Sequence, residues 1–164
     1  MEDVITYIVV FGLGFILVGI YLFGKEKKRV LPLSKQMYSD AIFTISVVKE
    51  QRKVSGINMA LKFPKKAQTV QHLIIELVNT KKETSVVNIT DSITRSDIKG
   101  AEGPFDYEAY ISFVTFKKLL EEHSFPFESF RIIAETLEGK KYKSHYLGLH
   151  NWWNILKLDS GTYN

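Results

Sequence analysis

A mainly β fold, preceded by a single transmembrane α-helix, is the architecture that this 164-residue sequence predicts. Three observations support it. Residues 4–24 carry no charged side chain, the apolar residues of the later chain recur mostly with a period of two, and turn-forming residues separate these short runs. A period of two is typical of half-buried strands, whereas an amphipathic helix has a period near 3.6. We therefore expect a membrane anchor followed by one antiparallel β-domain.

The segment 4–24 has the length and composition of a membrane-spanning helix. At roughly 1.5 Å of rise per residue it covers about 31 Å, close to the ~30 Å hydrocarbon thickness of a bilayer. Fourteen of its residues are Val, Ile, Leu or Phe, which favour insertion by at most ~4 to 8 kcal/mol. A secretory signal peptide fits less well, because the N-terminus reads "MED" and the run ends without a small-residue cleavage site.

The flanking residues predict the orientation of this anchor. No lysine or arginine precedes it, and four basic residues follow it directly: Lys25, Lys27, Lys28 and Arg29. Basic residues favour the cytoplasmic side, so we expect a single-pass protein of the inner or plasma membrane, with its N-terminus outside and its C-terminal domain in the cytoplasm. The same four charges could contact anionic lipid headgroups, at up to about 1 kcal/mol each. A role in topology alone explains them equally well.

Composition divides the chain into an anchor at 1–24, a basic juxtamembrane linker at 25–35 and a soluble domain at 36–164. Pro32 lies in the linker and discourages the anchor helix from continuing. The third part has the length of one domain and can bury a core without covalent support. The chain has no cysteine, which excludes disulfide bonds and thiolate metal sites.

The soluble domain shows the alternation of β-strands in several segments. Apolar side chains take every second position in "AIFTISVV" (41–48) and "INMALKF" (57–63), and each pattern predicts a strand. "HLIIELV" (72–78) and "SVVNI" (85–89) flank the polar "NTKKET", which predicts a hairpin. "FRIIAETL" (130–137) and "YKSHYLGL" (142–149) flank the turn-like "EGKK" and predict a second hairpin.

Two further strands and one short helix complete the predicted fold. We expect strands in "YEAYISFVTF" (107–116) and "NWWNILKL" (151–158), and a helical turn in "KKLLEEHS" (117–124) that Pro126 closes. About eight short strands spaced by roughly ten residues predict an antiparallel sandwich, and an immunoglobulin-like arrangement is the best single prediction. The cysteine pair of antibody domains is missing, so the likeness is one of pattern only.

Catalytic and metal-binding motifs are missing from the sequence, so we expect no enzymatic activity and no cofactor. The histidines are scattered, without the spacing of a metal site: His72, His123, His145 and His150. An enzyme that uses His145 or His150 is the least favoured alternative, because side chains five residues apart in an unbroken strand lie on opposite faces. The net charge of +4 resides partly in lysine pairs on separate turns, so we expect no nucleic-acid partner.

Two features predict contact with other proteins. Gly12 and Gly19 are seven residues apart and nearly eclipsed on the anchor helix, which makes a groove of small residues for another helix. Glycine is also common in spanning helices without any such role. Trp152 and Trp153 are adjacent, so in a strand they point to opposite faces. We predict Trp153 in the core and Trp152 as an interface residue, because Trp153 shares parity with Ile155.

The sequence therefore predicts a single-pass, membrane-anchored β-sandwich that acts as a non-catalytic accessory or interaction subunit of a membrane protein complex. Its expected partners are an integral membrane protein and anionic lipid headgroups. The alternative from another class is a membrane-tethered domain that binds a lipid or a small apolar ligand between its sheets.

Overall fold

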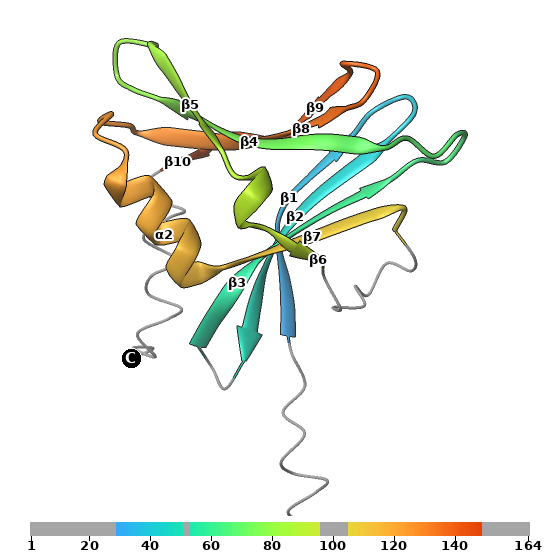
Figure 1. Ribbon diagram of the computed structural model, residues 1–164, viewed down its shortest axis with the longest axis horizontal. Coiled ribbons are helices and arrows are strands. Elements are labelled where there is room, and N and C mark those ends of the chain that lie inside the picture. Colours follow the sequence, from blue (N-terminus) through green and yellow to red (C-terminus); the bar gives the residue numbers. More distant parts are fainter. Residues whose placement is uncertain (1–28, 51–52, 96–104, 149–164) are drawn as a thin grey trace, which may run out of the picture.

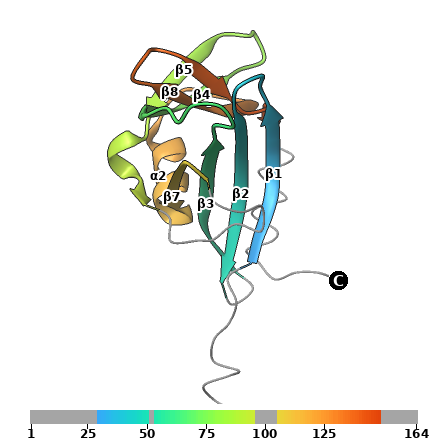
Figure 2. The same cartoon turned by 90° about the vertical axis from the view of Figure 1, so that its right-hand side faces the viewer.

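The computed structural model describes residues 29–50, 53–95 and 105–148 and folds them into two packed antiparallel sheets (Figure 1). This confirms the mainly β, two-sheet part of the prediction. Figure 2 shows the strands of one sheet side by side, with the other sheet lying across one end of them. Among the described residues, no helix has the length and apolar character needed to cross a membrane. The predicted anchor at 4–24 and the predicted strand at 151–158 lie outside the described residues.

Sheet 1 has the strand order β1-β2-β3-β7-β6. Its strands are β1 (Arg29–Met37), β2 (Ile42–Glu50), β3 (Lys53–Lys62), β6 (Thr94–Arg95) and β7 (Tyr107–Ser112). Sheet 2 has the order β10-β8-β4-β5, and β9 also pairs with β8. Its strands are β4 (Val70–Val78), β5 (Thr84–Asn88), β8 (Ser129–Thr136), β9 (Lys141–Lys143) and β10 (Leu147–Gly148). The hairpins β4–β5 and β8–β9 are those that the turn sequences predict, but the predicted strand at 142–149 is divided into β9 and β10, which both pair with β8.

The core lies between the sheets and follows the predicted alternation. In β2, Phe43, Ile45 and Val47 point inward and are fully buried, as the pattern of "AIFTISVV" predicts. Large side chains from both sheets fill the interior: Phe43, Met59 and Leu61 from sheet 1, and Leu73, Ile75, Phe130 and Tyr142 from sheet 2. Because each buried large apolar side chain contributes about 1.5–3 kcal/mol, this shared core holds the two sheets together.

One strand is shorter and the helix longer than the sequence predicts. β7 ends at Ser112, and α2 (Phe113–Glu122) begins four residues before the predicted helical turn. The Ser112 hydroxyl accepts a hydrogen bond from the Thr115 backbone N–H, which caps the helix. Phe113, Phe116 and Leu120 then reach the core at helical spacing. A 3₁₀ turn, η1 (Thr90–Ser92), connects β5 towards β6.

The predicted linker is the other correction, because residues 29–35 belong to β1 and pair with β2. Pro32 ends no structure there. It lies on an edge strand, and the pairing register shifts between Pro32 and Ser34. Edge strands and bulges are the places where a sheet tolerates proline, since no ladder hydrogen bond depends on its missing N–H.

A network of polar and aromatic contacts joins the turn after β1 to sheet 2. The Tyr38 hydroxyl donates to the Lys143 carbonyl and accepts from the Lys143 N–H, each at 2.6 Å. The buried Tyr142 hydroxyl lies 3.0 Å from Asp40 Oδ2 and 3.2 Å from Gln68 Oε1, and Lys140 bonds the same Asp40 oxygen. These contacts tie the two sheets at one end, in addition to the apolar core.

Candidate functional site

Most residues that the sequence singles out lie outside the described ranges. These are Gly12, Gly19, Lys25, Lys27, Lys28, His150, Trp152 and Trp153. Arg29 begins β1. The predictions for helix packing, headgroup contact and a tryptophan interface therefore stay predictions.

The histidines within the described residues lie in different places. His145 Nδ1 is 3.2 Å from Ser34 Oγ, and the same oxygen accepts the His145 backbone N–H at 3.1 Å. This contact ties the chain after β9 to β1. His123 at the end of α2 bonds Ser85 of β5 at 2.8 Å. Within the described ranges, no three His, Asp or Glu side chains are grouped to hold a metal ion.

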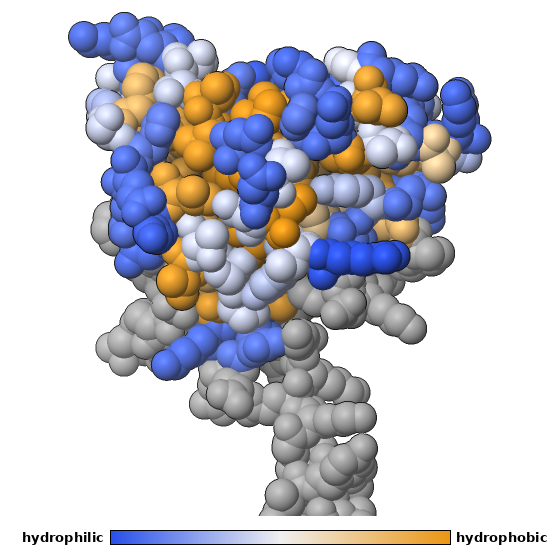
Figure 3. All heavy atoms as spheres, viewed as in Figure 1, coloured by the Kyte–Doolittle hydropathy of each residue, from blue (hydrophilic) through white to orange (hydrophobic). Residues whose placement is uncertain are grey.

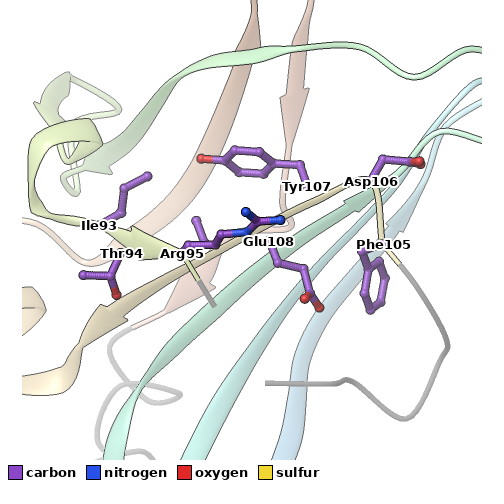
Figure 4. Close-up of a pocket in the computed structure, with 8 residues that line it drawn as sticks. Ile93, Thr94, Arg95, Phe105, Asp106, Tyr107 and Glu108 are labelled. Atoms are coloured by element: carbon purple, nitrogen blue, oxygen red, sulfur yellow. The ribbon is translucent and has the colours of Figure 1, made fainter. Parts of the chain in front are cut away.

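A pocket of about 440 Å³ lies at the β6–β7 edge of sheet 1 (Figure 4). Its described lining comes from the residue after η1 and from β6 on one side, and from the two residues before β7 and the start of β7 on the other: Ile93, Thr94, Arg95, Phe105, Asp106, Tyr107, Glu108 and Ala109. Figure 4 shows Asp106 and Tyr107 on one side of the β7 ribbon and Glu108 on the other. The two carboxylates therefore do not form an acid–base pair.

Burial changes the pKa of two ionisable groups in this pocket. Burial raises the pKa of the Tyr107 phenol and that of the Glu108 carboxyl above their ordinary values. The Asp106 side chain supports the fold, because its Oδ2 accepts a hydrogen bond from the Phe63 backbone N–H at 2.6 Å. Glu108 has no such partner among the described residues, and its Oε1 is buried.

Glu108 belongs to a wider polar set on the outer face of sheet 1, the face turned away from sheet 2. Thr44 and Glu108 both pair with Ala60, one on each side, and Asn58 lies two residues from Ala60 on the same face. We call Thr44, Asn58 and Glu108 the outer polar set. Each has a buried oxygen without a hydrogen-bond partner in the described part of the chain. The Asn58 amide oxygen and the Glu108 carboxylate oxygen can only accept hydrogen bonds, so these positions suit N–H donors.

Two grooves lie on either side of the segment 125–127, which follows α2. One, of about 350 Å³, is shared with the end of α2 and includes Leu120 and His123; the other, of about 380 Å³, is shared with the β4–β5 turn. Phe125 and Phe127 pack partly against the core, and the exposed Pro126 lies between the grooves. Figure 3 shows hydrophobic side chains gathered on this face between α2 and β5.

The outer face of sheet 2 carries a polar cluster of a different kind. Arg131 Nε bonds Glu76 Oε2 at 2.5 Å, the Tyr146 hydroxyl donates to the same oxygen at 2.9 Å, and the Arg131 guanidinium stacks 4.4 Å from the Tyr146 ring centre. Burial opposes the charge of Glu76, but these hydrogen bonds outweigh it and lower its pKa. The polar groups of this cluster are therefore bonded to one another.

Sequence reasoning does not find the outer polar set or the groove pair. Glu108 reads as a normal outward residue of an alternating strand, and nothing local marks its burial. The spacing of Phe125 and Phe127 around Pro126 is a visible signal for an aromatic surface loop, but it predicts no groove. Comparison with known proteins adds no identity: no family model, curated protein or solved structure matches this chain.

Proposed function

We propose that this chain is a single-pass, membrane-anchored β-sandwich that serves as a non-catalytic interaction subunit of a membrane protein complex. Residues 4–24 form its anchor, its N-terminus is outside, and its domain is cytoplasmic. The glycines Gly12 and Gly19 face a partner helix, and Trp152 contributes to the interface. The proposal rests on the uncharged N-terminal segment and on the character of the domain surface.

The observation that carries the interaction role is the groove pair around 125–127. Partly buried aromatic rings beside open grooves are features of protein-binding surfaces, because an apolar side chain of a partner fills such a groove and removes it from water. The exposed Pro126 between the grooves has no backbone N–H to donate, and its ring restricts the backbone of this segment. A partner that presents one or two apolar side chains fits this surface.

The non-catalytic role is part of this proposal, and several polar side chains of the described residues have structural hydrogen bonds. Ser34 Oγ is bonded by the backbone as well as by His145, Asp106 is bonded by a backbone N–H, and Asp40 is bonded by Lys140 and Tyr142. These side chains connect parts of the fold, and the Ser85–His123 contact at 2.8 Å joins β5 to the end of α2. The alternative, a lipid or small apolar ligand between the sheets, gains no support, because the pockets described above lie at edges and beside α2.

The immunoglobulin-like arrangement is not carried into this proposal. In that fold the chain crosses between the two sheets after its second strand. Here β1, β2 and β3 are consecutive neighbours in sheet 1, and the chain crosses after β3. We therefore propose that the anchor carries an antiparallel β-sandwich whose strand order differs from that of the immunoglobulin fold.

The test is co-purification of the full chain from membranes in mild detergent, with mass spectrometry of the bound proteins. We expect one fixed membrane partner, and we expect Pro126→Lys to reduce its recovery at least five-fold by placing a charge between the grooves. Val114→Lys is the matched control, since Val114 is 77% exposed on α2 and lines neither groove.

Equal recovery with both variants, or no partner at all, contradicts the interaction role. The same cells test the topology, because the chain has no cysteine of its own. A cysteine at Gly139 should resist an impermeant thiol reagent in intact cells, while one beside Met1 should react. The reverse result would place the domain outside.

A further inference from the structure

Among the described strands, all edge strands of the two sheets but one have a feature that hinders pairing with another chain. Exposed strand edges invite pairing with other chains, and proteins block them with proline, bulges, charges or short strands. β1 has Pro32 and a register shift. β6 and β10 are two residues long, and β9 has three residues, two of them lysines.

β5 has none of these devices. Its five residues, "TSVVN", include no charge and no proline, and its register with β4 runs without a shift. Within the described residues β4 is its only strand partner, and Figure 1 shows β5 at the rim of sheet 2. Val86 at the centre of β5 is 61% exposed.

The hydrogen bonds at the two ends of β5 show which backbone groups face the open side. Asn79 N–H donates to the Glu83 carbonyl at 3.1 Å, and Ile89 N–H donates to the Leu73 carbonyl at 2.9 Å. Bonded pairs alternate along an antiparallel ladder, so Ser85 and Val87 bond β4. The N–H and C=O groups of Thr84, Val86 and Asn88 therefore point away from β4, to the free edge.

We propose that β5 pairs antiparallel with β5 of a second copy of this chain, about a two-fold axis through Val86. In that register Val86 meets its own counterpart, and Thr84 of each copy meets Asn88 of the other. These are three pairs of residues whose backbone groups all face outward, and each pair exchanges two hydrogen bonds. The two copies form one continuous sheet.

The sequence around β5 suits its own copy. The two exposed Val86 side chains lie side by side on the outer face and shield each other from water. No like charges oppose each other along the strand. Beyond its ends, Lys81 lies five residues before Val86 and Asp91 five residues after it, so antiparallel pairing places the positive end of one copy beside the negative end of the other.

The direction of the chains agrees with a pair in one membrane. A two-fold axis between antiparallel edge strands runs perpendicular to the sheet, and an isologous contact of this kind closes as a dimer. Figures 1 and 2 show sheet 2 across the top of the molecule and the start of β1 at the bottom. Both copies therefore send their N-terminal ends the same way. Five-residue edges give a small contact, so its strength rests on the proposed anchor, which concentrates the copies.

The test places single cysteines in the full chain, which has none of its own. Val86→Cys, in native membranes, should give a covalent dimer with a short bifunctional thiol reagent. Thr84→Cys is the control in the same strand and on the same face. Its two copies lie four residues apart along the edge, about 14 Å at ~3.4 Å per residue. We expect at least ten-fold less dimer from Thr84→Cys.

Three results would overturn the proposal. They are no dimer from Val86→Cys, equal yields from both positions, or a Val86→Cys product that contains a different protein. A second measurement uses no cross-link: in native membranes, energy transfer between copies that carry donor and acceptor fluorophores should be lost in Val86→Lys, whereas Val114→Lys should leave it unchanged. Because partner recovery is measured separately through Pro126→Lys, loss of the dimer and loss of the interaction role give different results.

Discussion

The outer faces of the two sheets handle their polar side chains in opposite ways. On sheet 2, Glu76, Arg131 and Tyr146 bond one another. On sheet 1, the outer polar set of Thr44, Asn58 and Glu108 has no such partner in the described ranges. These side chains of sheet 1 are buried at least as deeply as the sheet 2 pair, since Thr44 is 7% and Asn58 4% exposed, whereas the Glu76 side chain is 15% exposed.

The difference shows what burial alone does to a polar group. Burial disfavours the charge of both Glu76 and Glu108, yet the pKa of Glu76 falls and that of Glu108 rises, because only Glu76 receives hydrogen bonds from described residues. A buried oxygen without a partner costs roughly 1–3 kcal/mol. The polar groups on the outer face of sheet 2 therefore stabilise one another, and sheet 1 retains acceptors that no described residue uses.

The largest expected effect on the outer face of sheet 1 comes from Gly56→Ala. A Cβ there would lie 2.4 Å from the Ile111 carbonyl oxygen and from the Tyr110 ring, and the backbone atom cannot move aside. Overpacking of this kind costs about 3 kcal/mol. Thermal or urea unfolding measures it. Gly148→Ala is the matched control, since the nearest atom to its Cβ is 4.0 Å away; similar losses from both would remove the steric explanation.

Arg131→Ala tests the completeness of the cluster on sheet 2. It leaves the Glu76 carboxylate with one hydrogen bond, and we expect a loss of about 2 kcal/mol at neutral pH. The lowered pKa of Glu76 means that this stabilisation is present above the ordinary glutamate pKa and disappears as the pH falls through the folded value. The difference between variant and wild type should therefore shrink in acid.

The control for Arg131 is an exposed ion pair. Lys66 lies 3.8 Å from Glu138, and both side chains are largely in water, so Lys66→Ala should change stability by less than about 0.5 kcal/mol. A loss from Arg131→Ala that is no larger, or that does not depend on pH, contradicts the cluster's role.

Glu108→Gln should have the smallest effect and the opposite sign. A raised pKa means that the folded state is favoured below the ordinary glutamate pKa and loses stability as the pH rises through the folded value. Glutamine has no charge to bury, so the variant should gain on wild type with rising pH, by less than about 1 kcal/mol at neutrality. Glu128→Gln, on the exposed segment before β8, is the control for the removal of a glutamate charge. A destabilised Glu108→Gln would indicate a bonded carboxylate.

Alternation predicts the strands of this fold well where one face is apolar, and it misleads at two boundaries. In 107–116, Phe113 continues the odd-numbered alternation of Ala109 and Ile111, so strand and helix patterns agree over that stretch. Only the Ser112 cap and the spacing from Phe113 to Phe116 mark the change. "VLPLSK" reads as a linker because Pro32 is weighed without its partner strand, whereas pairing with β2 and a bulge accommodate it.

The candidate sites depend on partners that sequence does not show. Glu108 belongs to the outer polar set only because strand pairing places it opposite Ala60, two residues from Asn58 and across β3 from Thr44. The groove pair needs the end of α2 and the β4–β5 turn, which are more than thirty residues apart in sequence. The open edge of β5 needs the strand order, since composition alone does not tell a rim strand from a central one.

The early start of β1 limits how far the domain can travel. For an anchor that ends at Gly24, only residues 25–28 precede β1, and four extended residues reach at most about 14 Å. With the proposed anchor, so short a connection would keep the domain at the bilayer surface, where it would meet partners by lateral diffusion in two dimensions. A soluble partner would then have to come to the membrane. A longer connection would change encounter rates without altering any contact within the sandwich.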